Sequence, residues 1–222
     1  MSVLPDRDPG PAPSPRLEAA MAKLPLVAIL RGLTPEEAPA IGHALVDAGF
    51  TLIEVPLNSP RPFESIAALR AALPAEVLLG AGTVMTVEEI AALRTAGGEL
   101  VVMPHADTAL IRAAKAQGLL CIPGVATPTE AFAARAAGAD ALKLFPAEAL
   151  PPPVLKAWRA VLPPALRVLP VGGVTPESLA AWRAAGAGGA GLGSALYAPG
   201  RTAAEVLARA RDFAEAWHSK AG

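Results

Sequence analysis

One lysine of this sequence lies inside an apolar stretch. Lys143 is flanked by leucines in DALKLFPAE, residues 140–148, a stretch whose composition is typical of a buried strand. Burial disfavours the ammonium form and lowers the pKa of a lysine, which leaves a neutral amine able to attack a carbonyl carbon near neutral pH. We therefore predict that Lys143 forms a Schiff base. The alternative is a structural lysine that is ion-paired or extends its amine to solvent.

Three further polar residues belong to or follow the first apolar runs. Glu54 lies in LIEVP, and a carboxylate beside an imine-forming lysine can transfer the protons for carbinolamine dehydration and for carbon-acid steps. Arg31, after LVAIL, can donate two hydrogen bonds to a substrate carboxylate, and the Thr83 hydroxyl can bind the same group or the carbinolamine. Taken singly, Glu54 and Arg31 could equally form a structural ion pair. Taken with Lys143, they predict a site for an α-keto acid.

Two pairs of small residues predict where a phosphate binds. Gly172-Gly173 and Gly193-Ser194 each follow one of the last two apolar runs. In barrels of alternating parallel strands and helices, backbone N–H groups and a helix N-terminus at these positions hold phosphate. A glycine pair alone is weak evidence because tight turns also use glycine, but two pairs at these positions favour a phosphorylated sugar acid.

The elements that would position these residues repeat along the chain. Short apolar runs that end in a turn signal alternate with alanine-rich stretches of helical spacing. There are eight runs: LVAIL, LIEVP, LLGAGTV, LVVMP, LLCIP, ALKLFP, RVLPVGG and GAGLGS. Runs without polar alternation are typical of parallel strands covered on both faces, so we predict an α/β fold, a single (β/α)8 TIM barrel. A doubly wound open sheet is the alternative.

Helix boundaries are marked by capping residues and glycines. Helices should begin where a capping residue precedes proline or an acidic residue, at Thr34, Asn58, Thr86, Thr127 and Thr175. They should end at the glycines of DAGF, TAGGE, AAGAD and AAGAG. An additional N-terminal helix, from Ser14 to about Ala22, would close the bottom of the barrel. The chemistry then belongs at the opposite end, where the carboxyl ends of the strands lie.

Composition excludes several classes of partner. The formal net charge is −1 and the pI is about 6.3, so no basic field would attract nucleic acid or an anionic membrane. Residues 1–15 contain five prolines and predict a disordered tail rather than a signal peptide. No apolar run reaches the roughly 20 residues that span a bilayer, so we expect a cytoplasmic protein. Cys121, in LLCIP, should pack as a small hydrophobic residue.

The histidines do not indicate a metal site. His43, His105 and His218 are scattered and lack the spacing of metal ligands. His105 follows the fourth apolar run, near the expected mouth of the barrel, and we favour a loop or capping role for it over catalysis.

Several of these stretches resemble one known family. LPLVAILRGLTPEEA, DAGFTLIEVPLNSP, GAGTV, ALKLFPAE, VGGVTPE and GAGLGSALY closely resemble the class I 2-keto-3-deoxy-6-phosphogluconate and 2-keto-3-deoxy-6-phosphogalactonate aldolases. Order and spacing are kept from residue 24 to about residue 217. The resemblance implies a TIM barrel, usually homotrimeric, that works without a metal or cofactor. We therefore expect an aldolase domain over residues 16–222.

The resemblance also implies a reaction and the residues that perform it. It places the Schiff base on Lys143 and proton transfer on Glu54. Substrate-binding positions fall on Arg31, Thr83, Gly173, Gly193 and Ser194, and Val171 and Gly172 complete the predicted set. The reaction is the reversible cleavage of a phosphorylated keto acid to pyruvate and D-glyceraldehyde 3-phosphate, a step of carbohydrate metabolism.

Two positions distinguish the branches of this family. Asn58, in PLNSP, and Val171, before the glycine pair, resemble the galactonate type, whereas gluconate-type relatives carry arginine and threonine there. We therefore predict 2-keto-3-deoxy-6-phosphogalactonate as the substrate, in galactonate degradation, with the gluconate-derived compound as the alternative. Two other functions stay open: a phosphate-binding barrel isomerase, epimerase or decarboxylase without a covalent step, and a non-catalytic sugar-acid sensor.

Overall fold

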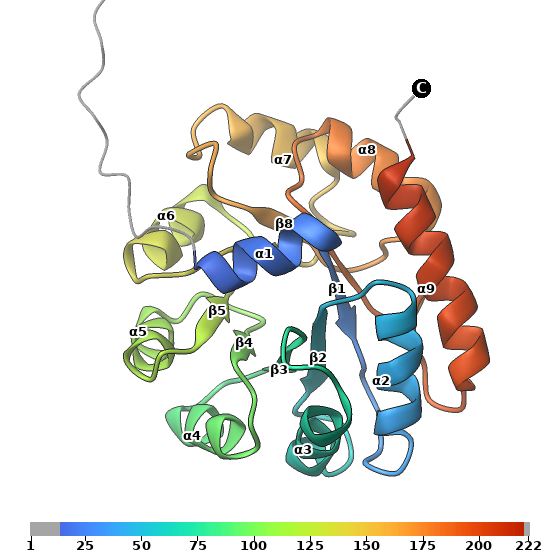
Figure 1. Ribbon diagram of the computed structural model, residues 1–222. Helices are drawn as coiled ribbons and strands as arrows, with labels where there is room; N and C mark the ends of the chain where they lie inside the picture. The colour runs from blue at the N-terminus through green and yellow to red at the C-terminus, as the bar shows by residue number, and fades with distance from the viewer. Residues whose placement is uncertain (1–13, 220–222) are drawn as a thin grey trace, which may run out of the picture.

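The strands of the computed structural model, which describes residues 14–219, run parallel around a common interior (Figure 1). They form a six-stranded sheet in the order β5-β4-β3-β2-β1-β9 and a three-stranded sheet in the order β6-β7-β8. The strands are β1 (Leu26–Ile29), β2 (Leu52–Pro56), β3 (Leu78–Gly82), β4 (Leu100–Val102), β5 (Leu120–Ile122), β6 (Gly124–Val125), β7 (Leu142–Leu144), β8 (Val168–Pro170) and β9 (Ala190–Leu192).

The two sheets join at both edges and close the barrel. β5 and β6 are parts of one extended segment interrupted at Pro123, whose carbonyl still accepts a hydrogen bond from Lys143 N at 2.9 Å. At the other junction, Val171 after β8 pairs with Gly191 in β9 as a parallel bridge. The predicted (β/α)8 barrel is therefore confirmed, and the doubly wound open sheet is wrong.

Helices alternate with the strands and cover the outside of the barrel (Figure 1). The helices are α1 (Pro15–Lys23), α2 (Ala38–Asp47), α3 (Pro62–Ala72), α4 (Val87–Thr95), α5 (Thr108–Ala116), α6 (Pro128–Ala136), α7 (Pro152–Arg159), α8 (Leu179–Ala184) and α9 (Ala203–His218), with a 3₁₀ turn, η1 (Pro176–Ser178), before α8. The glycines that the sequence marks as helix ends, Gly49, Gly97, Gly138 and Gly186, have φ between 82° and 106°. Such left-handed conformations are typical of a glycine after a helix.

Three of the predicted helix starts agree with the observed caps. Thr86 Oγ1 accepts a hydrogen bond from Glu89 N at 3.2 Å, and the Glu89 carboxylate accepts one from Thr86 N at 3.0 Å, a complete capping box. Thr127 accepts a hydrogen bond from Glu130 N at 3.3 Å. Thr175 starts the 3₁₀ turn that leads directly into α8.

Two helices begin later than predicted. α2 begins four residues after Thr34, whose hydroxyl donates to Glu37 Oε2 at 2.8 Å instead of accepting from the helix backbone. α3 begins four residues after Asn58, and the neighbouring Ser59 accepts a hydrogen bond from Gly32 N at 2.9 Å. Both loops are therefore longer than predicted, and both lie at the carboxyl end of the barrel.

α1 lies across the amino ends of the strands and closes that end of the barrel (Figure 1). The predicted bottom helix is thus confirmed. Its apolar side packs on inward-facing strand residues in an interior core formed by Leu17, Ala20, Met21, Val27, Leu52, Leu78, Leu100, Val102, Leu120, Ile122, Ala141 and Leu169. The predicted tail, residues 1–15, lies outside the described residues except for Ser14 and Pro15, and Pro15 begins α1.

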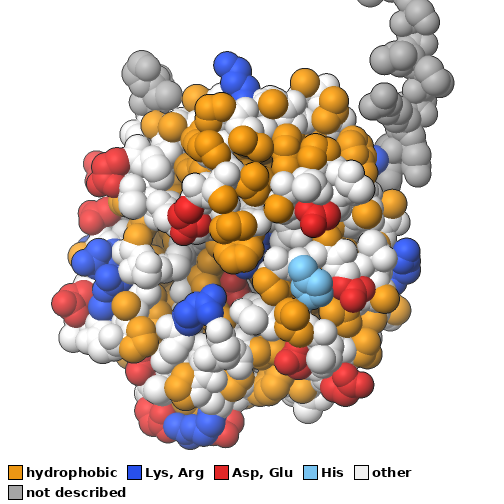
Figure 2. All heavy atoms as spheres, turned by 180° about the vertical axis from the view of Figure 1, so that it is seen from behind, with side chains coloured by type: hydrophobic (Ala, Val, Ile, Leu, Met, Phe, Trp, Pro, Cys, Tyr) orange, Lys and Arg blue, Asp and Glu red, His pale blue; other side chains and the backbone are white. Residues whose placement is uncertain are grey.

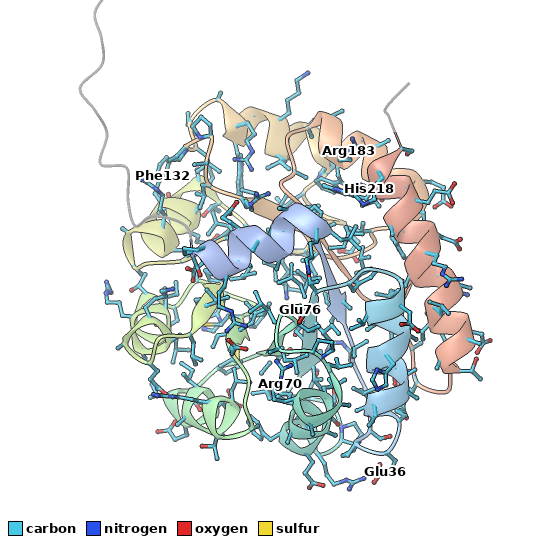
Figure 3. All side chains as sticks on the ribbon, viewed as in Figure 1. Glu36, Arg70, Glu76, Phe132, Arg183 and His218 are labelled. Carbon is cyan, nitrogen blue, oxygen red and sulfur yellow. The ribbon has the colours of Figure 1, made fainter. Side chains whose placement is uncertain are left out.

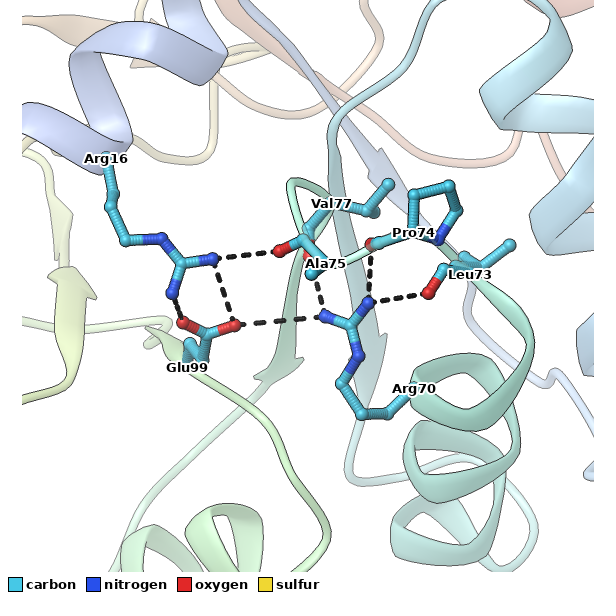
Figure 4. Close-up of polar contacts among 7 residues, drawn as sticks. All are labelled: Arg16, Arg70, Leu73, Pro74, Ala75, Val77 and Glu99. Carbon is cyan, nitrogen blue, oxygen red and sulfur yellow. Dashed lines mark hydrogen bonds and ion pairs between the residues drawn. The ribbon is translucent and has the colours of Figure 1, made fainter.

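A cluster of polar contacts joins α1 to the loops at the bottom of the barrel (Figure 4). Arg16 pairs with Glu99 and donates to Ala75 O at 3.0 Å. Arg70 lies 3.8 Å from the same carboxylate and donates to three carbonyls of the loop after α3. Partly exposed ion pairs contribute at most about 1 kcal/mol each, so the cluster orients α1 while apolar burial holds it.

A larger apolar core lies between the barrel and its outer helices. It contains Cys121, and burial, with a smaller effect of Asp140, raises the pKa of this thiol to about 12, so the packing role is confirmed.

Near the end of α9, the Arg183 guanidinium lies 5.5 Å from the ring centroid of Trp217, beside His218 (Figure 3). Within residues 14–219, no helix is long and apolar enough to cross a membrane.

Candidate active site

A cavity of about 490 Å³ opens at the carboxyl ends of the strands. Every predicted site residue lines it: Arg31, Glu54, Thr83, Lys143, Val171, Gly172, Gly173, Gly193 and Ser194. Figure 2 shows this face of the molecule, with basic and acidic side chains visible in a depression near its centre. A cavity of this size suits a small organic ligand.

Lys143 lies in β7 and is 7% exposed. Its Nζ lies 4.6 Å from the centroid of the Phe145 ring, so an aromatic face covers part of the amine. Burial lowers the pKa of Lys143, the Glu54 carboxylate opposes this shift, and the charge of Arg31 adds to it. This direction agrees with the prediction, and burial makes the amine more easily deprotonated than a lysine in water.

Glu54 lies in β2 and is only 1% exposed. Burial raises the pKa of this carboxyl group to about 7, while the charges of Lys143 and Arg31 oppose the shift. Its Oε2 atom is buried and has no hydrogen-bond partner among residues 14–219. A carboxyl group with a pKa near 7 can both accept and donate protons at neutral pH.

The space beneath this pair is small and mostly apolar. A pocket of about 10 Å³ lies between Lys143, Glu54 and side chains of the barrel interior such as Val102 and Leu169. That volume is at the lower limit for a single water molecule. The amine and the carboxyl group are therefore open to solvent and substrate from the cavity above, and the floor of the site is closed.

Gly82, at the end of β3, gives the Glu54 side chain its position. A Cβ atom added to Gly82 would lie 1.5 Å from Glu54 Oε2, so no other residue fits while the carboxyl group stays where it is. Sequence reasoning used the adjacent Thr83 and missed this requirement. The motif GAGTV contains both residues, but the contact joins positions on different strands and is visible only in the fold.

Arg31 is exposed at the rim of the cavity, on the loop after β1. Hydrogen bonds to neighbouring loops hold this loop: among them, Gly32 N donates to Ser59 Oγ at 2.9 Å, and the Tyr197 hydroxyl donates to the Glu37 carboxylate. The guanidinium can thus approach a ligand carboxylate from the rim. The loop that carries it is tied to the loops after β2 and β9.

Thr83 adopts an uncommon backbone conformation at the end of β3. Its φ is +59°, in the left-handed region that β-branched residues avoid. A strained backbone of this kind is found preferentially at functional sites. The conformation brings Thr83 to the cavity wall, where sequence reasoning placed it.

The other side of the cavity is formed by backbone rather than by cations. Gly172 and Gly173 have φ of +117° and +63°, conformations that L-residues rarely adopt. The Glu148 side chain packs on both: a Cβ on Gly172 would lie 2.0 Å from Glu148 Oε2. Gly193 has no atom within 4 Å of such a Cβ, which leaves room for a ligand over its backbone.

Several lining residues were missed by sequence reasoning: Ile29, Phe145, Glu148, Val174, Thr175, Ala195, Tyr197, Ala198 and Pro199. Phe145 and Glu148 follow Lys143 closely in KLFPAE, so proximity to Lys143 could have indicated them. Asn58 and His105 do not line the cavity. His105 Nδ1 is buried without a hydrogen-bond partner among the described residues. Residues 14–219 contain no group of three or more His, Cys, Asp or Glu side chains that could hold a metal ion.

Sequence comparison identifies relatives over most of the chain. The model of the family described as KDPG and KHG aldolase matches residues 17–210. A probable 2-dehydro-3-deoxy-6-phosphogalactonate aldolase of Rhizobium meliloti is 51% identical over 84% of this chain and 88% of its own length. A 2-dehydro-3-deoxy-6-phosphogalactonate aldolase of Escherichia coli is 49% identical over 88% of this chain and 95% of its own length.

Solved structures show the same fold. A structure described as native KDPGal superposes with a TM-score of 0.86, is 49% identical and covers 88% of this chain and 95% of its own. A KDPG aldolase of Legionella pneumophila, described with pyruvate captured as a covalent carbinolamine, superposes with a TM-score of 0.76 at 26% identity, over 89% of this chain and 97% of its own.

Proposed function

The chain belongs to the KDPG and KHG aldolase family, and we propose that it is a class I aldolase that cleaves 2-dehydro-3-deoxy-6-phosphogalactonate, the phosphorylated keto acid named above. The products are pyruvate and D-glyceraldehyde 3-phosphate. One observation carries the proposal: the buried Lys143 amine and the buried Glu54 carboxyl group line one cavity, with pKa values shifted toward their neutral forms. The similarity to galactonate-type enzymes at about half of all positions supports the choice of substrate.

Cleavage begins when the neutral Lys143 amine attacks C2 of the keto acid and forms a carbinolamine. Protonated Glu54 supplies the proton with which water leaves, and a protonated imine remains. The Glu54 carboxylate then takes the proton of the C4 hydroxyl. The C3–C4 bond breaks, its electron pair moves to the imine, and glyceraldehyde 3-phosphate leaves from an enamine of pyruvate.

The second half of the reaction returns both groups to their starting state. Glu54 gives its proton to C3 of the enamine, which restores the imine. Water adds to C2 and gives a proton to the Glu54 carboxylate, and expulsion of the neutral Lys143 amine from the carbinolamine releases pyruvate. A carboxyl pKa near 7 suits this alternation, since the group must act as acid and as base in one cycle.

The two ends of the substrate require different binding groups. We infer that Arg31 and the Thr83 hydroxyl bind the carboxylate of the keto acid, because a guanidinium forms paired hydrogen bonds with that group. We assign the phosphate to the backbone around Gly172, Gly173, Gly193 and Ser194. Glycine lets a ligand approach the chain closely there, and Gly193 has open space above it.

Val171 lines the cavity and is our candidate for the residue that distinguishes the substrates. The galactonate-derived and gluconate-derived compounds differ in configuration at C4, whose hydroxyl must reach Glu54. Valine cannot donate a hydrogen bond near that centre, whereas threonine could. We therefore propose that the enzyme acts on the galactonate-derived compound and has weaker activity on its C4 epimer, the gluconate-derived compound. A preference for the gluconate-derived compound is the alternative.

We further propose that the enzyme is a cytoplasmic homotrimer of galactonate degradation, with a catalytic domain that begins at α1. Met85, Val87 and Phe132 are large apolar side chains exposed at 49%, 46% and 38%. They lie near or within α4 and α6, and Phe132 points away from the barrel (Figure 3). Apolar side chains exposed in a single chain are available for contacts between subunits.

Borohydride reduction in the presence of pyruvate tests the covalent step. We expect irreversible inactivation and a mass increase of one reduced pyruvyl group, located on Lys143 by peptide mapping. Lys143→Met should form no adduct, while Lys156→Met, which removes an exposed lysine of α7, should react like the wild type. A wild-type enzyme without an adduct would favour the non-covalent isomerase or epimerase, and an adduct without turnover would favour the sensor.

A further inference from the structure

The peptide between Ser194 and Ala195 has its two polar groups in different surroundings. Its carbonyl, Ser194 O, accepts a hydrogen bond from Arg201 Nη1 at 2.7 Å. Its N–H, on Ala195, has no hydrogen-bond partner among residues 14–219. The peptide is trans, so the N–H and the carbonyl point in opposite directions. The free N–H is therefore directed away from Arg201, and it belongs to a residue that lines the cavity, which Arg201 does not.

The next peptide is held in the same way. Ala195 O accepts a hydrogen bond from Arg209 Nη1 at 3.2 Å, from the side of α9. Its own N–H, on Leu196, donates to Gly193 O at 2.9 Å and closes a single turn. Two guanidinium groups therefore hold two successive carbonyls of the segment that follows β9. Both arginines lie outside the cavity of about 490 Å³.

The sequence YAPGR brings Arg201 back to this segment. Arg201 N donates to Ala198 O at 3.1 Å, with Pro199 second in the turn and Gly200, at φ +86°, third. These are the residues that a type II turn requires at those positions. Thr202 then caps α9, so the Arg201 backbone is fixed between a turn and a helix start.

We propose that Arg201 is a positioning residue for the substrate phosphate: it orients the Ser194–Ala195 peptide so that the Ala195 N–H donates to a phosphate oxygen. Arg209 supports the same segment. The inference rests on the proposed function, because that function places a phosphate at this backbone. If this peptide group were flipped, its carbonyl oxygen would face the phosphate dianion and repel it. The arginine thus favours phosphorylated ligands without touching them.

The condensation direction separates this role from a general structural one. The wild type, Arg201→Met and the control Arg211→Met would be assayed with pyruvate and either D-glyceraldehyde 3-phosphate or unphosphorylated D-glyceraldehyde. Arg211 is an exposed residue of α9 outside the cavity. For Arg201→Met we expect kcat/KM to fall about tenfold, or about 1.4 kcal/mol, with the phosphorylated aldehyde and less than twofold with the other. Arg211→Met should match the wild type with both.

Further measurements make the test decisive. Pyruvate adduct formation with borohydride should be unchanged in Arg201→Met, because pyruvate carries no phosphate. Arg209→Met should show the same selective loss but a smaller one, since its hydrogen bond is longer, and it provides a second test if Arg201→Met folds poorly. An equal loss with both aldehydes, or no loss, would overturn the role of Arg201. A wild type that forms no adduct, or that does not prefer the phosphorylated aldehyde, would instead refute the proposed function.

Discussion

The Glu54→Gln variant should gain stability relative to the wild type as the pH rises from about 4.5 to about 7. Burial raises the pKa of Glu54 from 4.5 to about 7 in the folded protein. Between these values the carboxyl group is protonated when folded and ionised when unfolded, so wild-type stability is lost as the pH rises through this window. Each pKa unit is worth about 1.4 kcal/mol, so the interval from 4.5 to 7 corresponds to about 3 kcal/mol. Glutamine keeps the shape of the side chain but does not ionise.

Urea unfolding at several pH values, at one protomer concentration, measures this difference. Titrations common to both proteins largely cancel when the variant is compared with the wild type at each pH. Glu36→Gln is a control for which the pH dependence of stability has the opposite sign. Glu36 is exposed (Figure 3), and a hydrogen bond with Arg61 lowers its pKa. Its contribution is present above its unfolded pKa and lost as the pH falls. If the free-energy difference for Glu54→Gln stays constant across the range, burial does not set the charge of Glu54.

The pH dependence of activity should also be set by the Glu54 carboxyl group. Wild-type kcat/KM should decrease as the pH rises above about 7, because the reaction begins with a protonated Glu54, which supplies the proton with which water leaves the carbinolamine. Glu54→Gln should lose turnover by 100-fold or more while remaining folded, as expected for a general acid–base group. A basic limb that persists with the same midpoint in Glu54→Gln would assign it to another residue.

Three other predictions concern packing, specificity and assembly. Gly82→Ala should lower activity by about 100-fold and reduce stability by about 1–3 kcal/mol, because its Cβ would lie 1.5 Å from Glu54 Oε2. In a double-mutant cycle, the same substitution in a Glu54→Ala background should cost almost no stability. Val171→Thr should shift kcat/KM toward the gluconate-derived substrate by up to about tenfold, the worth of one hydrogen bond, and unchanged selectivity for both epimers would remove Val171 from the argument. Light scattering should give the mass of a trimer, and a monomeric mass would contradict the proposed assembly.

The barrel could be predicted because its strands are buried on both faces and therefore read as continuous apolar runs. Once the strands are placed, their carboxyl ends bring together polar residues that lie far apart in the sequence. This is why Arg31, Glu54 and Lys143 were found without knowledge of any contact between them. The starts of α2 and α3 could not be found in this way, since Glu37 and Ser59 bind residues of other loops rather than their own helices.

The parts of the site that were missed depend on contacts between side chains and backbone of different elements. The pattern of apolar and polar residues does not show that Gly82 faces Glu54, or that Glu148 packs on Gly172. Arg201 reads as an exposed arginine between a turn and a helix cap. Its significance comes from the carbonyl that it reaches, and a sequence pattern carries no information about the direction of a peptide group.

The contact between Gly82 and Glu54 also constrains how this site can change by mutation. A side chain at position 82 must displace the Glu54 carboxyl group from its present place, and with it the proton transfer that this group performs. A shorter residue at position 54 would make room but would remove the carboxyl group altogether. Gly172 is constrained twice, since its φ of +117° disfavours any side chain and its Cβ would lie 2.0 Å from Glu148 Oε2. Directed evolution toward another reaction therefore gains more from libraries that vary positions 54 and 82 together than from libraries that vary Gly82 alone.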